Sequence, residues 1–184
     1  PLLISEPRII PVVISAGRLD KLKDYETLIK AVKLVKQTRP VRLIILGEGS
    51  LRESLESLIQ NLNLEDDIAL PGFVNNPFPY MKKADVFVLS SISEGLPNTL
   101  IQSLALGIKV VSTNCQNGPE EILESGRWGY LVPIKNSEEM SKAIIQSLEV
   151  NLPKNNALSK KYCEEKFGKN KISSSYLKIL FNSN

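Results

Sequence analysis

The sequence contains no histidine among its 184 residues, and this absence removes several classes of active site. A Ser-His-Asp triad, a Cys-His pair and a zinc site built on imidazole all require histidine. Any chemistry that the chain performs must therefore use carboxylates, lysines, arginines and backbone amides.

Cysteine is scarce, and signals for secretion or membrane insertion are lacking. The two cysteines, Cys115 and Cys163, form no Cys-x-x-Cys pair, and no Asn-x-Ser/Thr glycosylation acceptor occurs. This usage favours a reducing, cytoplasmic compartment. No apolar run approaches the ~18 residues of a membrane span. The N-terminal residues lack the basic start and apolar stretch that are typical of a signal peptide, and Pro1 indicates a sequence cut from a longer chain, so that an N-terminal partner domain is expected.

The overall composition is that of an ordinary globular domain, with 42% hydrophobic and 23% charged residues. The length predicts one domain, or one domain with a terminal appendage. The net charge of +3 is small, and the basic residues are spread along the chain. Nucleic acid is therefore not expected as a partner.

Apolar strand patterns alternate with helical patterns along most of the chain. The expected strands cover residues 12–14, 41–46, 68–70, 85–89, 109–112 and 130–132. The expected helices cover residues 24–35, 51–62, 100–105, 120–123 and 137–148. Continuous apolar strands separated by helices are typical of a parallel sheet that is covered on both faces. The sequence therefore predicts a doubly wound, Rossmann-like α/β fold.

The alternation stops at Pro153, so we expect one domain over residues 1–150 and C-terminal helices over residues 151–184. Two polar helical stretches follow the proline. Their apolar residues are Tyr162 and Phe167 in the first stretch, and Ile172, Tyr176, Ile179, Leu180 and Phe181 in the second. These apolar faces need a partner.

Positive charge follows the first expected strand. In doubly wound sheets, ligands bind beyond the carboxyl ends of the strands. Arg18, Lys21 and Lys23 lie in the first of these loops, ahead of a helix whose dipole disfavours cations at its start. A diphosphate held by backbone amides, Arg18 and Lys23 would remove this conflict. The alternative is three solvated charges in a surface loop.

The loop after the expected strand 85–89 has the most informative pattern. Residues 90–99 read Ser-Ser-Ile-Ser-Glu-Gly-Leu-Pro-Asn-Thr. They combine a carboxylate at Glu94, a glycine that permits close backbone approach and a proline near a helix start. Asn98 and Gln102 lie one turn apart on the same helix face. The pattern favours a ligand site, and the alternative is a well-capped helix with an exposed Glu94.

The segment Gly47-Glu48-Gly49 begins like a dinucleotide-binding fingerprint but does not complete it. Arg52 stands where the third glycine of that fingerprint belongs. The segment therefore favours a plain turn, with Ser50 capping the next helix, and the alternative is a phosphate-binding loop.

With these residues, the chain resembles the carboxyl-terminal, donor-binding half of retaining glycosyltransferases of family 4, which have the two-domain GT-B architecture. The shared motifs span most of the chain. They are Gly17-Arg18-Leu19 with Lys23, Leu46–Gly49, Pro71–Val74, Ala84–Ser91, Ser93–Asn98, Gly107, Val110–Thr113, Gly118-Pro119 and Gly129–Pro133.

The resemblance implies a role for each candidate residue. Arg18 and Lys23 would bind the diphosphate of a sugar nucleotide and neutralise the leaving group, and Glu94 would contact the donor sugar. These three are the expected catalytic residues. The other expected contacts to the nucleotide sugar are Gly17, Phe73, Val74, Gly95, Leu96, Pro97, Asn98, Thr99 and Gln102.

The resemblance also implies the reaction and its partners. Residues 1–150 would bind a UDP-, GDP- or ADP-sugar without a metal or other cofactor. The sugar would pass with retention of configuration to a glycan or lipid-linked acceptor, in polysaccharide biosynthesis at the cytoplasmic face of a membrane. The acceptor half, an N-terminal domain of the same protein, is absent, so the chain alone should bind donor and transfer little. Residues 151–184 would pack on both halves.

Gln102 departs from the family pattern, because a second glutamate that binds ribose hydroxyls would stand there. Hydrogen bonds to charged groups are stronger than neutral ones, so we expect nucleotide binding that is weaker by about tenfold. A catalytically decayed sugar-nucleotide-binding module is therefore one alternative. A nicotinamide-dependent dehydrogenase is another, on fold class alone, and a structural or interaction protein is the third.

Overall fold

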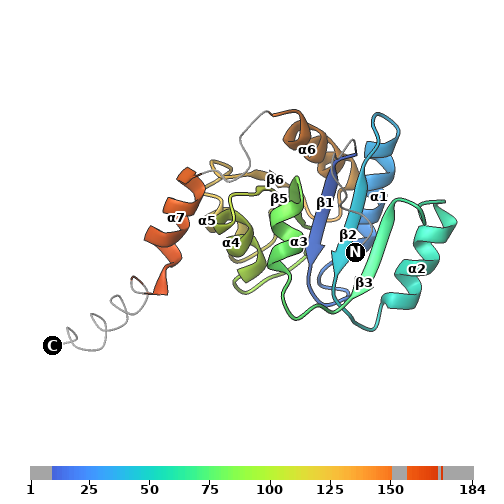
Figure 1. Cartoon of the computed structure of the whole chain (residues 1–184), viewed down its shortest axis with the longest axis horizontal. Coiled ribbons are helices and arrows are strands. Elements are labelled where there is room, and N and C mark those ends of the chain that lie inside the picture. The colour runs from blue at the N-terminus through green and yellow to red at the C-terminus, as the bar shows by residue number, and fades with distance from the viewer. Residues whose placement is uncertain (1–9, 151–156, 170, 172–184) are drawn as a thin grey trace.

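The computed structural model describes residues 10–150, 157–169 and 171, which contain a six-stranded sheet with helices on both faces (Figure 1). All neighbouring strands are parallel, in the order β3-β2-β1-β4-β5-β6. The strands are β1 (Val12–Ala16), β2 (Arg42–Leu46), β3 (Ile68–Gly72), β4 (Val86–Leu89), β5 (Lys109–Thr113) and β6 (Tyr130–Val132). This arrangement confirms the predicted doubly wound, Rossmann-like fold.

Two apolar clusters, one on each face of the sheet, hold the helices. Side chains of successive strand residues point to opposite faces, so Val13 belongs to one cluster and Ile14 to the other. The Val13 cluster includes residues of α1 (Tyr25–Lys36), α2 (Arg52–Asn61) and α6 (Ser137–Glu149). The Ile14 cluster includes residues of α3 (Phe78–Lys83), α4 (Asn98–Ala105), α5 (Pro119–Ile122) and α7 (Ala157–Phe167).

The strand order reverses between β1 and β4. The chain builds outward from β1 through β2 to β3, then returns to place β4 on the other side of β1. Such a switch point opens a crevice beyond the carboxyl ends of the two strands, where ligands of doubly wound proteins bind. The loops that follow β1 and β4 border this crevice, and they are the loops in which the sequence predicts the ligand site.

The helix starts agree with the sequence at some places and differ at others. Asp24 caps α1 as expected: its φ is 46°, and its carboxylate accepts a hydrogen bond from the Thr27 amide. The expectation that Ser50 caps the next helix is wrong, because α2 begins at Arg52 after Leu51 and has no side-chain cap. Helix α3 is not among the expected helices, since its six residues are too few to give a helical stripe.

Helix α7 packs against α4. It lies at the end of the molecule opposite β3 (Figure 1). Three of its side chains bind backbone carbonyls: Ser159 bonds to Leu104 of α4, while Tyr162 and Lys166 bond to Ile122 and Glu121 of α5. The Tyr162 ring also stacks on Trp128, with 4.8 Å between ring centroids.

The second expected C-terminal helix, with its apolar residues between 172 and 181, lies outside the described residues, as does the segment 151–156. The division of the chain at residue 150 stays a prediction.

Gly47 allows the loops after β1 and β2 to touch. The Gly17 amide donates to the Leu46 carbonyl at 2.9 Å, and a Cβ placed on Gly47 would lie 1.9 Å from the Gly17 carbonyl oxygen. The φ of Gly47 is 150°. We therefore expect Gly47→Ala to lower the free energy of unfolding by about 3 kcal/mol, measured by urea denaturation.

Gly95→Ala is the matched control, because a Cβ there would meet nothing within 4 Å. Its free energy of unfolding should change by less than about 0.5 kcal/mol. Equal stability of the two variants would show that the contact between the loops is not tight.

Candidate functional site

Lys23 and Glu94 form an ion pair across the switch point. The Lys23 Nζ lies 2.6 Å from Glu94 Oε1, and the hydroxyl of Ser91 donates to the same carboxylate oxygen at 2.5 Å. The two loops are also joined through the backbone, because Ser90 Oγ donates to the Lys23 carbonyl at 2.6 Å. Two sequence-predicted residues that are 71 positions apart thus meet at one place.

The ion pair is partly buried but still open to a ligand. The side chain of Lys23 is 22% exposed and that of Glu94 is 11% exposed. Ser91 beneath them is fully buried. Without a ligand, the Lys23 cation therefore faces a carboxylate in surroundings that screen charge less than water does.

A pocket of about 440 Å³ adjoins the ion pair. Its size lies within the usual range for small-molecule sites. The lining residues come from the loops after β1, β2 and β3 and from the start of α4; they are Ala16, Gly17, Arg18, Leu46, Gly47, Glu48, Phe73, Val74, Pro77 and Thr99. Five of the sequence-predicted residues are among them: Gly17, Arg18, Phe73, Val74 and Thr99.

Gly17 links the pocket to the ion pair. It lines the pocket, and a Cβ on it would lie 3.2 Å from Cε of Lys23. The pocket and the Lys23–Glu94 pair are therefore parts of one site. That site offers the cations of Arg18 and Lys23, the carboxylates of Glu94 and Glu48, and a mostly apolar cavity, which together suit a ligand with an anionic centre.

The remaining predicted residues lie on the β4–α4 loop and on α4. Gly95, Leu96 and Asn98 are exposed, Pro97 is buried just before the helix, and Gln102 is half-buried in the helix. The turn after β5 supports this loop: Ser93 forms a bridge with Gln116, and a Cβ on Gly118 would lie 2.6 Å from Cδ of Pro97. These residues border the crevice. In the described part of the chain, none of their side chains forms a hydrogen bond with Lys23 or Glu94.

Sequence reasoning missed two residues of the site. Ser91 could have been found, because a polar pair that ends an apolar strand is unusual in a buried position. Glu48 could not have been found from the sequence, because its place in the pocket depends on tertiary structure. Arg52 donates to its two carboxylate oxygens at 2.6 and 2.8 Å, and this hydrogen bonding lowers the pKa of Glu48. Glu48 therefore stays negatively charged.

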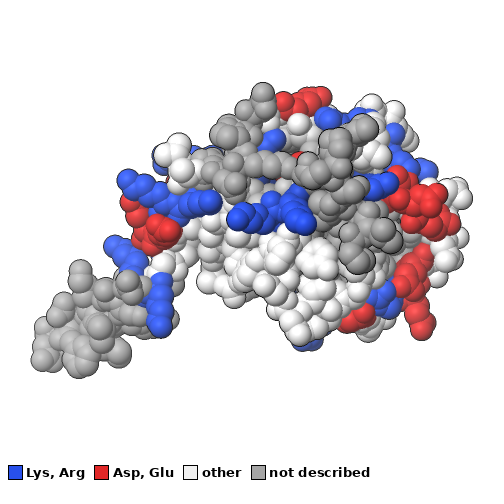
Figure 2. Space-filling view, in the orientation of Figure 1, with Lys and Arg blue, Asp and Glu red and all other residues white. Residues whose placement is uncertain are grey.

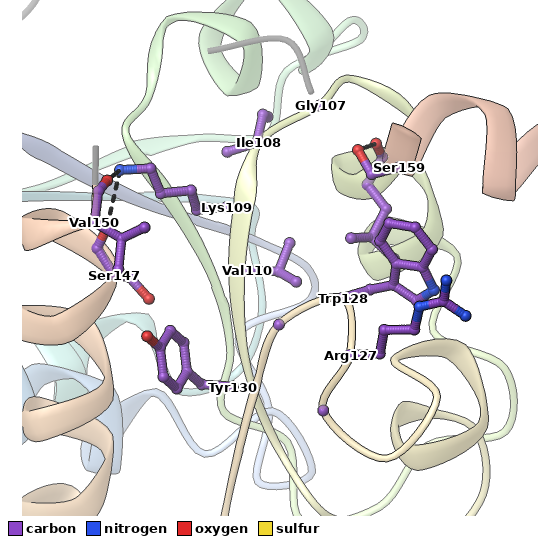
Figure 3. Close-up of a pocket in the computed structure, with 13 residues that line it drawn as sticks. Gly107, Ile108, Lys109, Val110, Arg127, Trp128, Tyr130, Ser147, Val150 and Ser159 are labelled. Atoms are coloured by element: carbon purple, nitrogen blue, oxygen red, sulfur yellow. Dashed lines mark hydrogen bonds between the residues drawn. The ribbon is translucent and has the colours of Figure 1, made fainter. Parts of the chain in front are cut away.

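A second cavity of about 460 Å³ lies at the amino ends of β5 and β6, away from the crevice (Figure 3). Figure 3 shows Trp128 and Arg127 on one side of it and Tyr130 on the other. The Lys109 ammonium there bonds to the carbonyls of Ser147 and Val150, at the end of α6. No residue expected for ligand binding lines this cavity.

The described residues also bear on metal and membrane binding. Among them, we find no group of three or more Cys, Asp or Glu side chains that could hold a metal ion. In the described part of the chain, no helix is both long enough and apolar enough to cross a bilayer. On the face in Figure 2, basic side chains lie in separate groups, and a broad area toward the carboxyl ends of the strands carries little charge.

Comparison with known proteins gives a family match. Residues 7–164 match the family described as glycosyl transferases group 1. The chain is 41% identical over 137 residues to a Campylobacter jejuni enzyme, N-acetylgalactosamine-N,N'-diacetylbacillosaminyl-diphospho-undecaprenol 4-alpha-N-acetylgalactosaminyltransferase, covering 74% of this chain and 37% of that protein. It is 32% identical over 184 residues to the lipopolysaccharide core biosynthesis glycosyltransferase LpsE of Rhizobium meliloti, covering 96% and 52%.

Solved structures share the fold. A variant of Staphylococcus aureus TarM, in a complex that contains UDP, superimposes with a TM-score of 0.85 at 23% identity, covering 97% of this chain and 38% of that protein. Anabaena HepE in complex with UDP gives 0.84 at 22% identity, covering 93% and 48%. The chain thus spans about half or less of the length of these relatives.

Proposed function

The chain belongs to the glycosyl transferases group 1 family, and on this basis we propose that it binds a nucleoside-diphosphate sugar in the crevice between β1 and β4. The observation that carries the proposal is the meeting of Lys23, Glu94 and the pocket beside Arg18 at the switch point. Phosphate, sugar and nucleoside each have a matching group there: the cations, the Glu94 carboxylate and the mostly apolar pocket.

Each residue has a defined role in this proposal. Arg18 and Lys23 bind the diphosphate and stabilise the negative charge that develops on it as the bond to the sugar breaks. They supply the positive charge that a divalent cation supplies in other enzymes. Glu94 accepts hydrogen bonds from sugar hydroxyls. The pocket bordered by Phe73 and Val74 holds the base of a UDP-, GDP- or ADP-sugar.

We propose further that the chain is the donor half of a retaining, family 4 hexosyltransferase. Leu22, Phe73 and Leu96 on the loops at the carboxyl edge are 53%, 72% and 54% exposed. Such apolar exposure at the mouth of a site is typical of a surface that another domain covers. An N-terminal half would cover it and carry the acceptor, because the chain spans only part of its relatives.

The acceptor in this proposal is a glycan or a lipid-linked glycan, reached at the cytoplasmic face of a membrane by peripheral contact. The support is the name of the Campylobacter jejuni relative, which acts on a diphospho-undecaprenol substrate. A dehydrogenase is no longer a candidate, since the family membership and the incomplete glycine fingerprint both oppose it.

Gln102 gives a direct test of the ribose contact. Gln102→Glu should tighten binding of UDP by about tenfold, because a charged acceptor replaces a neutral one. The gain should be smaller for 2′-deoxy-UDP, which lacks one ribose hydroxyl. Isothermal titration calorimetry of both ligands measures the difference, and an unchanged affinity for UDP would show that Gln102 does not face the ribose.

The location of the site is tested by nuclear magnetic resonance. On titration with UDP, the backbone amide shifts of Gly17, Arg18, Phe73 and Glu94 should change most. The amide of Trp128, beside the second cavity, is the internal control and should not move. Changes centred on Trp128 would contradict the proposed function.

A further inference from the structure

Tyr25, the first residue of α1, has a buried hydroxyl that plays no part in the site described so far. The residue is 3% exposed. Its hydroxyl oxygen has no hydrogen-bond partner among the residues that the structure describes. Buried hydroxyls are nearly always bonded, because an unpaired one loses its bonds to water without replacement. The Tyr25 hydroxyl is therefore available for a hydrogen bond to a molecule outside the chain.

The hydroxyl lies directly beside the loop after β1. A Cβ on Gly17 would lie 2.9 Å from the Tyr25 hydroxyl oxygen and 3.2 Å from Cε of Lys23. The Tyr25 hydroxyl, the Gly17 backbone and the Lys23 stem thus meet at one point. Gly17 lines the pocket and Lys23 reaches Glu94, so the unpaired hydroxyl adjoins both parts of the site.

The hydroxyl can only act as a donor toward an anion. Burial raises the pKa of Tyr25 far above its usual value, and the negative charges of Asp20 and Glu94 add to the rise, whereas the Ser15 hydroxyl opposes it. The Ser15 hydroxyl is near enough to Tyr25 to lower its pKa, but Ser15 donates its own proton to the Val88 carbonyl at 2.7 Å, and its position relative to the Tyr25 hydroxyl does not meet the geometry of a hydrogen bond. Tyr25 therefore keeps its proton at every physiological pH.

We propose that Tyr25 is a third diphosphate-binding side chain of this loop, whose hydroxyl donates a hydrogen bond to a nonbridging phosphate oxygen of the donor. This inference rests on the proposed function. The Lys23 stem lies beside the hydroxyl while Nζ pairs with Glu94. When Nζ turns from Glu94 to the diphosphate, the space beside Gly17 opens to a phosphate oxygen. Binding then satisfies a group that is unpaired in the free chain.

Tyr25→Phe tests the inference because it removes the hydroxyl and keeps the ring. We would titrate both forms of the chain with whichever of UDP, GDP and ADP binds best, and with the corresponding nucleoside. The Kd for the diphosphate should rise about tenfold, equivalent to 1.4 kcal/mol at 25 °C, and the Kd for the nucleoside should stay the same. The melting temperature should stay the same or rise, because an unpaired buried hydroxyl is gone.

Tyr162→Phe is the matched control. Its hydroxyl donates to the Ile122 carbonyl of α5 at 2.7 Å, and neither residue belongs to the site. This variant should melt at a lower temperature and bind the diphosphate as the unchanged chain does. The two tyrosines should thus respond in opposite ways, one in ligand binding and the other in stability.

Three results would overturn the inference. If Tyr25→Phe binds the diphosphate as tightly as the unchanged chain, the hydroxyl has no ligand and only the inference is wrong. The same holds if the variant weakens diphosphate and nucleoside binding equally, since the hydroxyl then does not act on phosphate. If the unchanged chain binds none of the three nucleotides, the inference and the proposed function fail together.

Discussion

Glu94→Gln is expected to lower the rate of sugar transfer by about 100-fold or more in the protein that includes the N-terminal half. The glutamine amide can still accept from Ser91, so the local structure should persist. The charge that stabilises the reacting sugar is lost, and single electrostatic contacts of this kind contribute factors of about 10²–10³. Steady-state kinetics with the donor sugar measure the change in kcat.

The same variant should not weaken binding of the nucleoside diphosphate. In the unchanged chain, Lys23 Nζ is held 2.6 Å from Glu94 Oε1, and a diphosphate must compete with that carboxylate. Glu94→Gln removes the competition, so the Kd should stay the same or fall. Glu26→Gln, at an exposed glutamate of α1, is the control and should leave both quantities unchanged. A large loss of nucleotide affinity in Glu94→Gln would place Glu94 on the nucleotide rather than on the sugar.

Lys23→Ala should have the opposite pattern, because it removes a cation from the diphosphate. A hydrogen bond to a charged group contributes roughly 1.5–3 kcal/mol, so the Kd for the nucleoside diphosphate should rise about 10- to 100-fold. The variant also leaves the partly buried Glu94 carboxylate without its cation, so the melting temperature should fall. Calorimetry and thermal unfolding measure the two effects.

Lys21→Ala separates a specific contact from general positive charge. Lys21 is an exposed lysine of the same loop, two positions from Lys23. If Lys23 binds the diphosphate directly, Lys21→Ala should change the Kd by less than about twofold, which is the size of a screened surface effect. Equal losses in the two variants would mean that the loop attracts anions only through its total charge.

The sequence predicts the sheet well because its strands are buried on both faces. Strands such as Leu43–Leu46 and Val86–Leu89 are short, continuous apolar runs, which are the patterns that sequence reasoning reads best. The short helix α3 leaves no such pattern. Pro77 precedes the helix as its N-cap and Pro79 is its second residue, and packing of Met81 into the core holds it in place.

Some features of the candidate site could likewise be predicted from the sequence, and others could not. Arg18, Lys23 and Glu94 could be predicted, because charged residues at strand ends are visible in a linear sequence. The contact between Lys23 and Glu94 could not, since it depends on the strand order that brings β1 beside β4. Tyr25 looks like an ordinary core aromatic in the sequence. Only its position beside Gly17 and its unpaired hydroxyl set it apart.

The central claim is that this chain binds a nucleoside diphosphate through the loop after β1. Calorimetric titration of the purified chain with UDP, GDP and ADP tests it most directly, followed by titration of Arg18→Ala with the tightest binder. The account predicts that one nucleotide binds most tightly and that Arg18→Ala weakens it by about tenfold or more. Absence of binding by all three nucleotides at millimolar concentration, or equal binding by Arg18→Ala, would contradict the account.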